Sequence, residues 1–418
     1  MRVLPLTNAI EEKILARRRG RDRAAETIAS RIIRDVQRRG DAALFAWTKR
    51  FDRVVLTRGN TWVSAQEMRE ASRRVSAEFL DAVDHAARNI RTVARRQKPQ
   101  AWTIEVEPGV RASQRVQPIE TVGLYIPGGR FSLVSTLLMT AIPAQEVGVR
   151  KIVIASPQPG DELLAAAAKL GLRHVARVGG AQAIAAFAYG TSTIPRVDKI
   201  FGPGNRYVTA AKRLVSGDCA IDLLAGPTEA IVFAQTGKPR FIAADLLAQS
   251  EHDPDAIALF VTTSSSFGRA VAAEIERQLS LLPKPNPAGR ALAKNGAVLI
   301  ARSPAQAVRF INRFAPEHLS LSGTAAVEFA DRFDSAGSIF LGDWSAQSFG
   351  DYATGTNHVL PTGGVARSRG GLSTADFVKC ISVQKVTRAG VARLAPVVRQ
   401  FAKAEGLLAH GRSVEVRQ

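Results

Sequence analysis

Apolar side chains recur every three to four positions in two stretches near the start of the chain, residues 25–39 and 64–97. That spacing places them on one face of an amphipathic helix, so both stretches are predicted to be helical. Residues 102–127 instead favour short strands, with a turn at Pro108-Gly109. A helical region is therefore expected to lead into a strand-rich segment.

Short apolar runs alternate with longer helical stretches over most of the remaining chain. A first series begins at residues 151–156 and closes at 229–234, and a second runs on to 338–342. Strands that alternate with helices imply βαβ units and parallel sheets. We therefore expect an α/β fold with two Rossmann-like parallel-sheet domains, plus small helical segments at the N and C termini. A duplication would explain two series, although no sequence repeat proves it.

The chain is basic, with 57 Lys and Arg against 37 Asp and Glu and a net charge of +20 in 418 residues. Such a balance raises nucleic acid as a partner. The arginines of residues 15–40, however, alternate with apolar positions and have acids among them, as on the solvated face of a helix. The four Trp and four Tyr give no regular spacing for base stacking. Nucleic-acid binding is therefore not expected; a basic nucleic-acid-binding protein without catalysis stays as the alternative of a different class.

Cysteine use and the lack of long apolar runs bear on location. Cys219 and Cys380 form neither a disulfide framework nor a CxxC metal spacing, which favours a reducing compartment. The first residues lack the apolar core of a signal peptide, and no apolar run approaches the ~18 residues of a membrane span. A cytoplasmic protein that does not contact a membrane is expected.

Glycine-rich turns follow two of the predicted strands. The dinucleotide fingerprint G-x-G-x-x-G is absent, as is the phosphate-binding G-x-x-x-x-G-K-[ST]. Residues 125–130, YIPGGR, and 201–207, FGPGNRY, supply other Gly-rich turns, and the second opens into a helix whose N-terminus can hold a phosphate. Each turn alone is a weak indication of a nucleotide site.

Four of the six histidines lie in polar clusters, each with an acid within a few residues: His252, His318, His358 and His410. Imidazoles and carboxylates from separate segments are the groups that a zinc or acid–base site needs. In RFAPEHLSL, Glu317 and His318 stand side by side among apolar residues, where an ionised carboxylate is costly unless it is paired. A solvated loop and a functional pair both remain open, because spacing does not say which residues meet.

Several segments together resemble the histidinol dehydrogenase family, from about residue 25 to the C-terminus. The matching segments are GLYIPGG, GGAQAIAAFAYGT, GPGNRYVTAAKRLV, IDLLAGPTE, ADLLAQSEHDPDA, FAPEHLSL, GDYATGTNHVLPT and AEGLLAHGRSVEVR. The resemblance implies a zinc-dependent homodimer that shares its active site between subunits. It implies an amino-alcohol substrate, L-histidinol, whose four-electron oxidation through L-histidinal to L-histidine reduces two NAD.

The resemblance also implies a role for each matching residue. The expected zinc ligands are Gln249, His252, Asp351 and, from the tail of the partner subunit, His410. The expected NAD contacts are Tyr125, Gln182 and Asn205. The expected substrate contacts are Thr228, Gln249, His252, Glu317 or His318, Asp351, Glu405 and His410. His318 is expected to be the general base for the alcohol, and Glu317 to activate the water that attacks the aldehyde.

The resemblance divides the chain into four parts. Residues 1–24 are expected to form an N-terminal helical segment, 25–119 with 236–372 a discontinuous domain with the zinc ligands and the Glu–His pair, 120–235 the NAD-binding domain, and 373–418 a tail that reaches the partner.

Some positions depart from the family pattern. Thr228 stands where Ser is usual, and Arg130-Phe131 follow the YIPGG turn where smaller residues are usual. A same-fold dehydrogenase of another polar alcohol, such as dihydroxypropanesulfonate, is therefore the alternative. Glu405 favours a cationic or imidazole-bearing substrate, so histidinol comes first.

Overall fold

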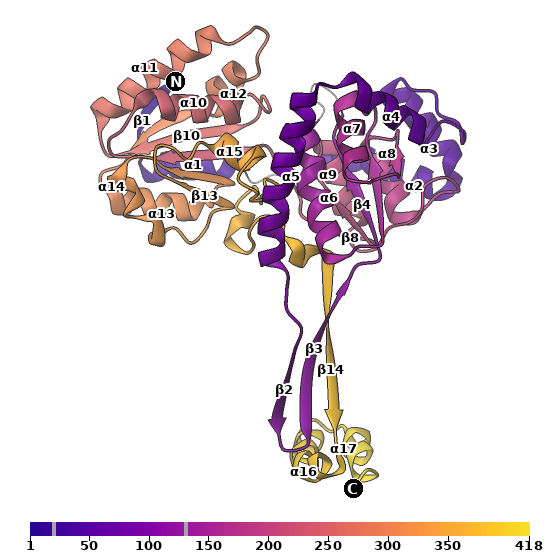
Figure 1. The fold of residues 1–418 in the computed structure, drawn as a ribbon. Helices are drawn as coiled ribbons and strands as arrows, with labels where there is room; N and C mark the ends of the chain where they lie inside the picture. Colours follow the sequence, from indigo (N-terminus) through magenta and orange to yellow (C-terminus); the bar gives the residue numbers. More distant parts are fainter. Residues whose placement is uncertain (19–21, 129–132) are drawn as a thin grey trace.

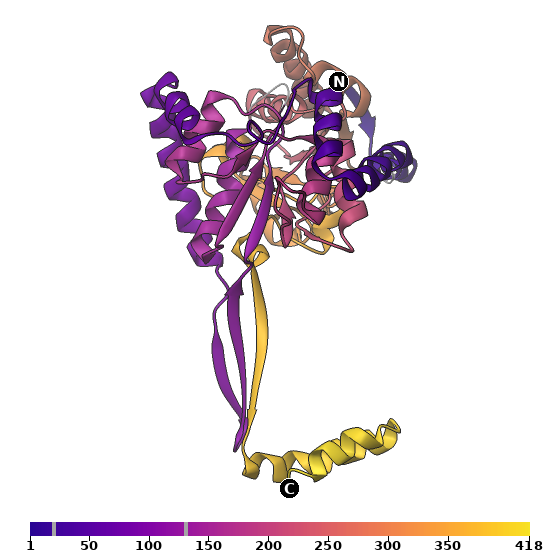
Figure 2. The ribbon, with the colours of Figure 1, turned by 90° about the vertical axis from the view of Figure 1, so that its right-hand side faces the viewer.

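The structure is a computed structural model that describes residues 1–18, 22–128 and 133–418 (Figure 1). Two α/β bodies lie side by side, and a narrow arm extends from them to the C-terminus (Figures 1 and 2). Arg130 and Phe131, whose departure from the family pattern is noted above, lie outside the described residues. Among those described, no helix has the length and apolar character needed to traverse a membrane.

Within the described residues, one body holds a five-stranded parallel sheet in the order β6-β5-β4-β7-β8. The strands are β4 (Thr121–Tyr125), β5 (Lys151–Ala155), β6 (Val175–Ala176), β7 (Lys199–Phe201) and β8 (Ala220–Ile221). The chain begins at the centre, moves to one edge and then returns to the other side of β4. This reversal between β4 and β7 is the switch point at which Rossmann-like sheets bind nucleotides.

The other body holds a sheet in the order β1-β11-β10-β9-β12-β13, also parallel and six-stranded over the described residues. Its strands are β1 (Arg2–Pro5), β9 (Glu229–Phe233), β10 (Ile257–Thr262), β11 (Ala297–Ile300), β12 (His318–Leu321) and β13 (Ser338–Leu341). From β9 onward the strand order repeats that of the five-stranded sheet. The prediction of two Rossmann-like parallel sheets is confirmed. The run at 229–234 was expected to close the first series, but β9 pairs with β10 and β12 and so opens the second sheet.

Helices cover both sheets. Those of the five-stranded body are α2 (Arg23–Arg39), α3 (Asp41–Asp52), α4 (Ala65–Arg74), α5 (Ala77–Gln97), α6 (Val134–Val147), α7 (Asp161–Lys169), α8 (Gly180–Tyr189) and α9 (Arg206–Val215). Those of the six-stranded body are α1 (Asn8–Arg18), α10 (Pro239–Ser250), α11 (Ser265–Leu281), α12 (Ala288–Asn295), α13 (Pro304–Phe314), α14 (Thr324–Val327) and α15 (Gln347–Tyr352). Short 3₁₀ turns cover Ala330–Arg332, Val365–Arg367 and Thr374–Phe377.

The amphipathic helices α2–α5 pack on the five-stranded body. Helix α2 contacts α8 and α9, α4 contacts α7, and α5 contacts α6. Their apolar stripes complete the two cores that line the faces of that sheet. The expected grouping of residues 25–119 with 236–372 therefore differs from the packing, because these helices cover the sheet that follows them in the chain. At the N-terminus, β1 adds a strand to the expected helical segment.

The arm is a three-stranded antiparallel sheet with two helices at its tip (Figures 1 and 2). Strands β2 (Trp102–Glu107) and β3 (Val110–Pro118) form a hairpin through the predicted turn, and Gly109 has φ +86° there. Strand β14 (Val378–Val386) pairs with β3 and leads to α16 (Arg388–Ala404) and α17 (Leu408–Glu415). The C-terminal segment thus contains the expected helix and, in addition, a long strand.

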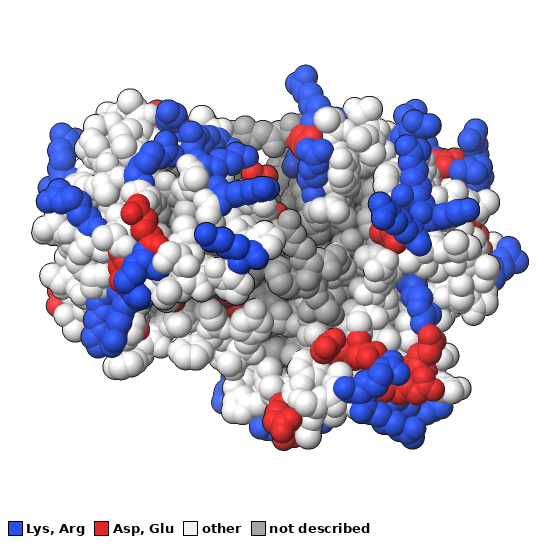
Figure 3. Space-filling model, turned by 90° about the horizontal axis from the view of Figure 1, so that it is seen from above, with Lys and Arg blue, Asp and Glu red and all other residues white. Residues whose placement is uncertain are grey.

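Basic side chains are spread over both bodies, with acidic ones between them on the face that Figure 3 shows. Helix α2 illustrates the pattern, because Arg39 pairs with Asp35 on its outer side while Ile32 and Val36 are buried. This agrees with the interpretation of the arginines as solvated helix faces.

Candidate active site

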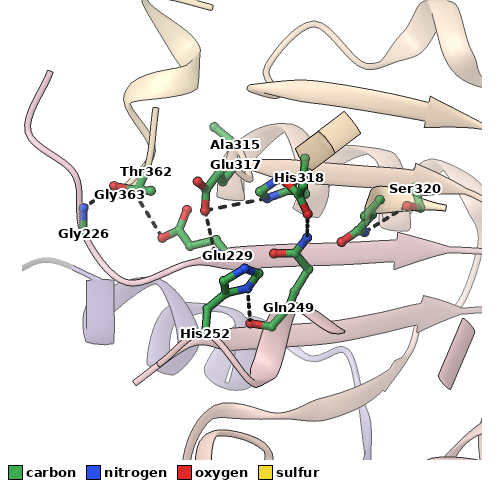
Figure 4. A network of polar contacts seen from close by, with 12 residues as sticks. Gly226, Glu229, Gln249, His252, Ala315, Glu317, His318, Ser320, Thr362 and Gly363 are labelled. Atoms are coloured by element: carbon green, nitrogen blue, oxygen red, sulfur yellow. Dashed lines mark hydrogen bonds and ion pairs between the residues drawn. The ribbon is translucent and has the colours of Figure 1, made fainter. Parts of the chain in front are cut away.

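Glu317 directly precedes β12 and His318 is its first residue, and the way α13 ends brings both inside the protein. Ser303 caps the start of α13, and the helix ends at Ala315, whose φ of +51° turns the chain back toward the sheet. Glu317 and His318 are then only 8% and 3% exposed. The solvated-loop interpretation is excluded, and the pair is a buried carboxyl beside a buried imidazole (Figure 4).

The His318 ring lies between two carboxylates. Its Nδ1 is 3.7 Å from Glu317 Oε2, and its Nε2 is 3.6 Å from Asp351 Oδ1. Both ring nitrogens are buried and form no hydrogen bond with the described residues. Burial opposes the charged ring, but Glu317 and Asp351 outweigh it and raise the pKa of His318. The imidazole is therefore placed to take up a proton.

Glu317 is held by a backbone group of the neighbouring strand. Its Oε2 accepts a hydrogen bond from the Glu229 N–H at 3.0 Å. Burial raises the pKa of Glu317 to about 7, although His318 acts in the opposite direction. A carboxyl group that titrates near neutrality is suited to general base catalysis.

A buried ion pair lies behind this site. Arg18, at the end of α1, donates to both carboxylate oxygens of Glu229, with Nε–Oε1 at 2.6 Å and Nη2–Oε2 at 2.5 Å. Arg18 also donates to the Phe314 carbonyl and lies over the Phe314 ring. Sequence reasoning missed both residues of the pair, because Arg18 reads as part of a solvated helix face. The only signal is the position of Glu229 directly after Thr228, in a matching segment.

The expected zinc ligands of this chain lie together at the ends of α10 and α15. Gln249 Nε2 donates to Asp351 Oδ2 at 3.0 Å, and the exposed His252 ring approaches the Gln249 carbonyl at 3.4 Å (Figure 4). Burial opposes an ionised Asp351, but His318, His358 and His252 lower the pKa of its carboxyl. Among the described residues, no group of three His, Cys, Asp or Glu could hold a metal ion.

His358 and Thr228 also lie close to these groups. His358 Nδ1 is 2.9 Å from the Asp351 carbonyl, so the structure brings together three of the four histidines that lie in polar clusters. Thr228 is half-buried and directly precedes Glu229, whose backbone holds Glu317. Its hydroxyl therefore belongs to the edge of the sheet on which the Glu–His pair stands.

The expected NAD contacts meet at the switch point of the five-stranded sheet. Tyr125 ends β4 and accepts from the Gly180 N–H at 3.2 Å, at the start of α8. Gln182 in α8 is fully buried, and Asn205 caps α9 by accepting from the Tyr207 and Val208 N–H groups. This is the place where a nucleotide binds in such folds.

The turn after β7 is fixed closely. Gly202 has φ +106°, and a Cβ there would lie 2.1 Å from the Tyr125 carbonyl oxygen, so only glycine fits. The buried Lys212 and Asp222 form an ion pair, and each also binds Gly202, through its carbonyl at 2.9 Å and its N–H at 2.7 Å respectively. The pair therefore locks the Gly-rich turn in place.

Glu405 and His410 do not reach the site of their own chain. Both are exposed at the tip of the arm, where Glu405 ends α16 and His410 lies in α17, away from both bodies (Figures 1 and 2).

A Rossmann-like switch point in one body and a buried carboxyl–imidazole pair in the other are features that an oxidoreductase can use. The family model for histidinol dehydrogenase matches residues 15–418. The chain is 48% identical to histidinol dehydrogenase of Vibrio parahaemolyticus over 391 residues, 92% of this chain and 90% of that protein. It is 44% identical to that of Geobacter metallireducens over 410 residues, 97% and 94% of the two chains. The chain therefore belongs to the histidinol dehydrogenase family.

A solved structure agrees with this assignment. The crystal structure of histidinol dehydrogenase from Elizabethkingia anophelis matches with a TM-score of 0.93 and 38% identity, over 100% of this chain and 98% of that one. The expected function, histidinol dehydrogenase, is confirmed at the level of the family.

The pH dependence of stability can be predicted for Asp245, which lies on α10 one turn before Gln249. Burial raises the pKa of Asp245 to about 6, although the Gln347 N–H lowers it. An unfolded Asp titrates near pH ~4, so the folded protein loses stability as the pH rises from ~4 through ~6. The free energy of unfolding of Asp245→Asn, relative to that of wild type, should therefore rise by about 2 kcal/mol between pH ~4 and pH ~7. Denaturant unfolding at several pH values measures this difference. The exposed Asp81→Asn is the matched control, and a gain independent of pH would contradict the prediction.

Proposed function

We propose that this enzyme oxidises L-histidinol through L-histidinal to L-histidine, with NAD and zinc, as a homodimer that shares its active sites. The observation that carries the proposal is the buried Glu317–His318 pair with Asp351 beside it. Two successive oxidations need two proton transfers of different kinds, one from an alcohol and one from water. Two adjacent bases of different chemistry meet that need. Since the product is an amino acid, we place the enzyme in cytoplasmic biosynthesis.

In the first half-reaction, His318 takes the hydroxyl proton as the alcohol carbon loses a hydride. In the second, Glu317 takes a proton from the water that adds to the aldehyde, and the resulting diol loses the second hydride to give the acid. Glu317 is suited to this role because its pKa is about 7. Two NAD molecules, bound one after the other, would each accept one hydride. Tyr125, Gln182 and Asn205 would hold the bound NAD at the switch point.

The residues of this chain fit a zinc ion. The Gln249 amide oxygen accepts no hydrogen bond from any described residue, while its amide nitrogen donates to the ionised Asp351. Amide and carboxylate oxygens with the His252 imidazole form a donor set that zinc accepts. Bound zinc, completed by His410 of the partner subunit, would polarise the substrate oxygen.

Exposed apolar surface supports the dimer. Large side chains of the arm are exposed, with Phe401 at 65% and Leu408 at 79%, and they continue along the arm sheet as Trp102, Ile104 and Val106. Exposed apolar side chains also lie on α15, the helix that carries Asp351, and just before it: Trp344, Phe349 and Tyr352. Large apolar side chains exposed together on one segment often mark protein–protein contacts. We propose that the arm of one subunit covers the α15 region of the other, which would bring His410 and Glu405 to the site.

Thr228 bears on the choice of substrate. It keeps a hydroxyl where Ser is usual but adds a methyl group, so the same chemistry on another polar alcohol is the second candidate. Comparison of kcat/KM for histidinol and dihydroxypropanesulfonate separates the two, and Glu405 of the partner subunit favours the cationic substrate.

The division of roles between the two bases can be tested with histidinol and histidinal supplied separately. His318→Gln should lower the rate of alcohol oxidation by roughly 10²–10⁴, the range for a lost general base. Glu317→Gln should slow mainly the oxidation of histidinal. Stopped-flow measurement of NADH formation gives both rates. Equal losses in both half-reactions for both variants would show that the roles are assigned wrongly.

Metal content tests the zinc assignment. Purified protein should hold about one zinc per chain, because one site uses the ligands of one chain and one partner. His252→Asn should lower that content, while His85→Asn, on the exposed side of α5, should not. Elemental analysis measures both without reference to activity. Protein with no zinc, and with activity unaffected by chelators, would contradict the assignment.

Subunit mixing tests the shared site. A His318→Gln subunit and a His410→Asn subunit, each inactive alone, should regain activity when mixed and refolded together. In the heterodimer one site carries both changes and the other neither, so about half the wild-type activity per heterodimer should return. Sites built within one chain would each carry one change, and activity would stay at the level of the separate variants.

A further inference from the structure

One carboxylate near the expected NAD contacts has no role among those that the family resemblance assigns. Asp52 ends α3, and its Oδ2 accepts from Gln182 Nε2 at 3.2 Å. Its backbone carbonyl accepts from Gln158 Nε2 at 2.9 Å. Gln158 follows β5, and Gln182 lies in the first turn of α8. Asp52 is therefore held where the carboxyl ends of β5 and β6 meet the crevice.

The carboxylate is in an unfavourable position unless it meets a ligand. Burial raises the pKa of Asp52 to about 6, and Gln182 lowers it. None of the ion pairs among the described residues includes Asp52. The carboxylate also stands at the C-terminal end of a helix, where the helix dipole disfavours an anion. A half-buried carboxylate with neither a cation nor a favourable dipole is typical of a binding site rather than of a stabilising contact.

The charge of Asp52 also acts on an expected cofactor residue. Burial raises the pKa of Tyr125 to about 12; the Gly180 contact opposes this, and Asp52 adds to it. Asp52 therefore lies near the Tyr125 hydroxyl as well as the Gln182 amide, so three side chains from three elements converge on the crevice.

A Rossmann-like sheet usually has an acidic residue after its second strand, and this sheet lacks one there. In such sheets an acid at the end of the second strand accepts hydrogen bonds from the adenosine ribose of NAD. Here the second strand is β5, and Ser156, Pro157 and Gln158 follow it without an acid. The next acid, Asp161, is occupied by Arg74, with Nε–Oδ2 at 2.6 Å. Asp52 comes from another element and brings a carboxylate to this corner of the crevice.

We propose that Asp52 binds the adenosine ribose hydroxyls of NAD and so selects NAD against NADP. The inference rests on the proposed function, in which NAD is the cofactor. Two hydroxyl donors would satisfy the carboxylate, whereas a 2′-phosphate would place a second anion beside it. Selectivity of this kind comes from repulsion of the wrong ligand as much as from attraction of the right one.

Calorimetric titration without substrate tests the inference, with NAD, NADP and 2′-deoxy-NAD, which lacks the adenosine 2′-hydroxyl. Asp52→Asn keeps an acceptor for Gln182 but removes the charge. It should weaken NAD binding about tenfold, as expected for the loss of hydrogen bonds to a charged group. It should change 2′-deoxy-NAD binding much less, and the preference for NAD over NADP should fall. Asp81→Asn is the control for loss of an exposed charge.

The outcomes separate the two proposals. If wild type binds NAD and 2′-deoxy-NAD equally well, or if Asp52→Asn weakens both equally, Asp52 only positions Gln182 and the inference is wrong. The comparison on wild type needs no variant, so it holds even if Asp52→Asn does not fold. If wild type binds none of the three nucleotides, NAD is not the cofactor, and the proposed function fails together with the inference.

Discussion

The ion pair between Arg18 and Glu229 holds together the parts from which the active site is built. Glu229 is buried at the start of β9, and its backbone N–H fixes Glu317. Arg18 neutralises that carboxylate and also binds the Phe314 carbonyl, just before the chain turns into β12. Without the arginine, a second buried carboxylate would stand uncompensated beside Glu317, and removal of one partner of a buried pair is strongly destabilising. Arg18 of α1, a helix outside the site, thereby allows Glu229 and Glu317 to be buried close to each other.

The connection between the two sheets joins opposite strand ends of the two bodies. Residues 222–228 connect the two sheets. They leave β8 at the carboxyl ends of the strands of the five-stranded sheet and enter β9 at the amino ends of the strands of the six-stranded sheet. The expected NAD contacts therefore lie at the carboxyl ends of their strands, where parallel sheets bind ligands. Glu317 and His318 instead lie at the amino ends of the strands of the six-stranded sheet. A Gly226 N–H to Thr362 hydroxyl bond at 2.6 Å ties this connection to the segment after α15 (Figure 4). Two sheets of like topology thus present opposite strand ends, with the expected NAD contacts at one and the Glu317–His318 pair at the other.

The spacing of apolar residues and the turn residues predicted the helices, strands and turns, because these depend on neighbouring residues in the chain. Helices and parallel strands were found where apolar spacing placed them, and the Pro108-Gly109 turn forms as expected. The sequence could not predict that α2–α5 would cover the sheet that follows them, because an amphipathic stripe does not say which surface buries it. Nor could it predict Arg18, whose partner Glu229 lies 211 residues away. The family resemblance named Gln249, His252 and Asp351; only the fold shows them adjacent, with His358 beside them.

The arm carries the features on which the proposed dimer rests. A three-stranded sheet that extends from the body keeps little core of its own, and β2 is exposed along its whole length. Its helices turn apolar side chains outward at the same end as Glu405 and His410. On α15 and just before it, apolar side chains are exposed in turn, close in the chain to the expected ligand Asp351. Exposed apolar surface and expected zinc ligands therefore occur together at both places. A contact between subunits that buries the apolar surface would also complete the set of expected zinc ligands. Dimer formation and catalytic activity would then both depend on the arm.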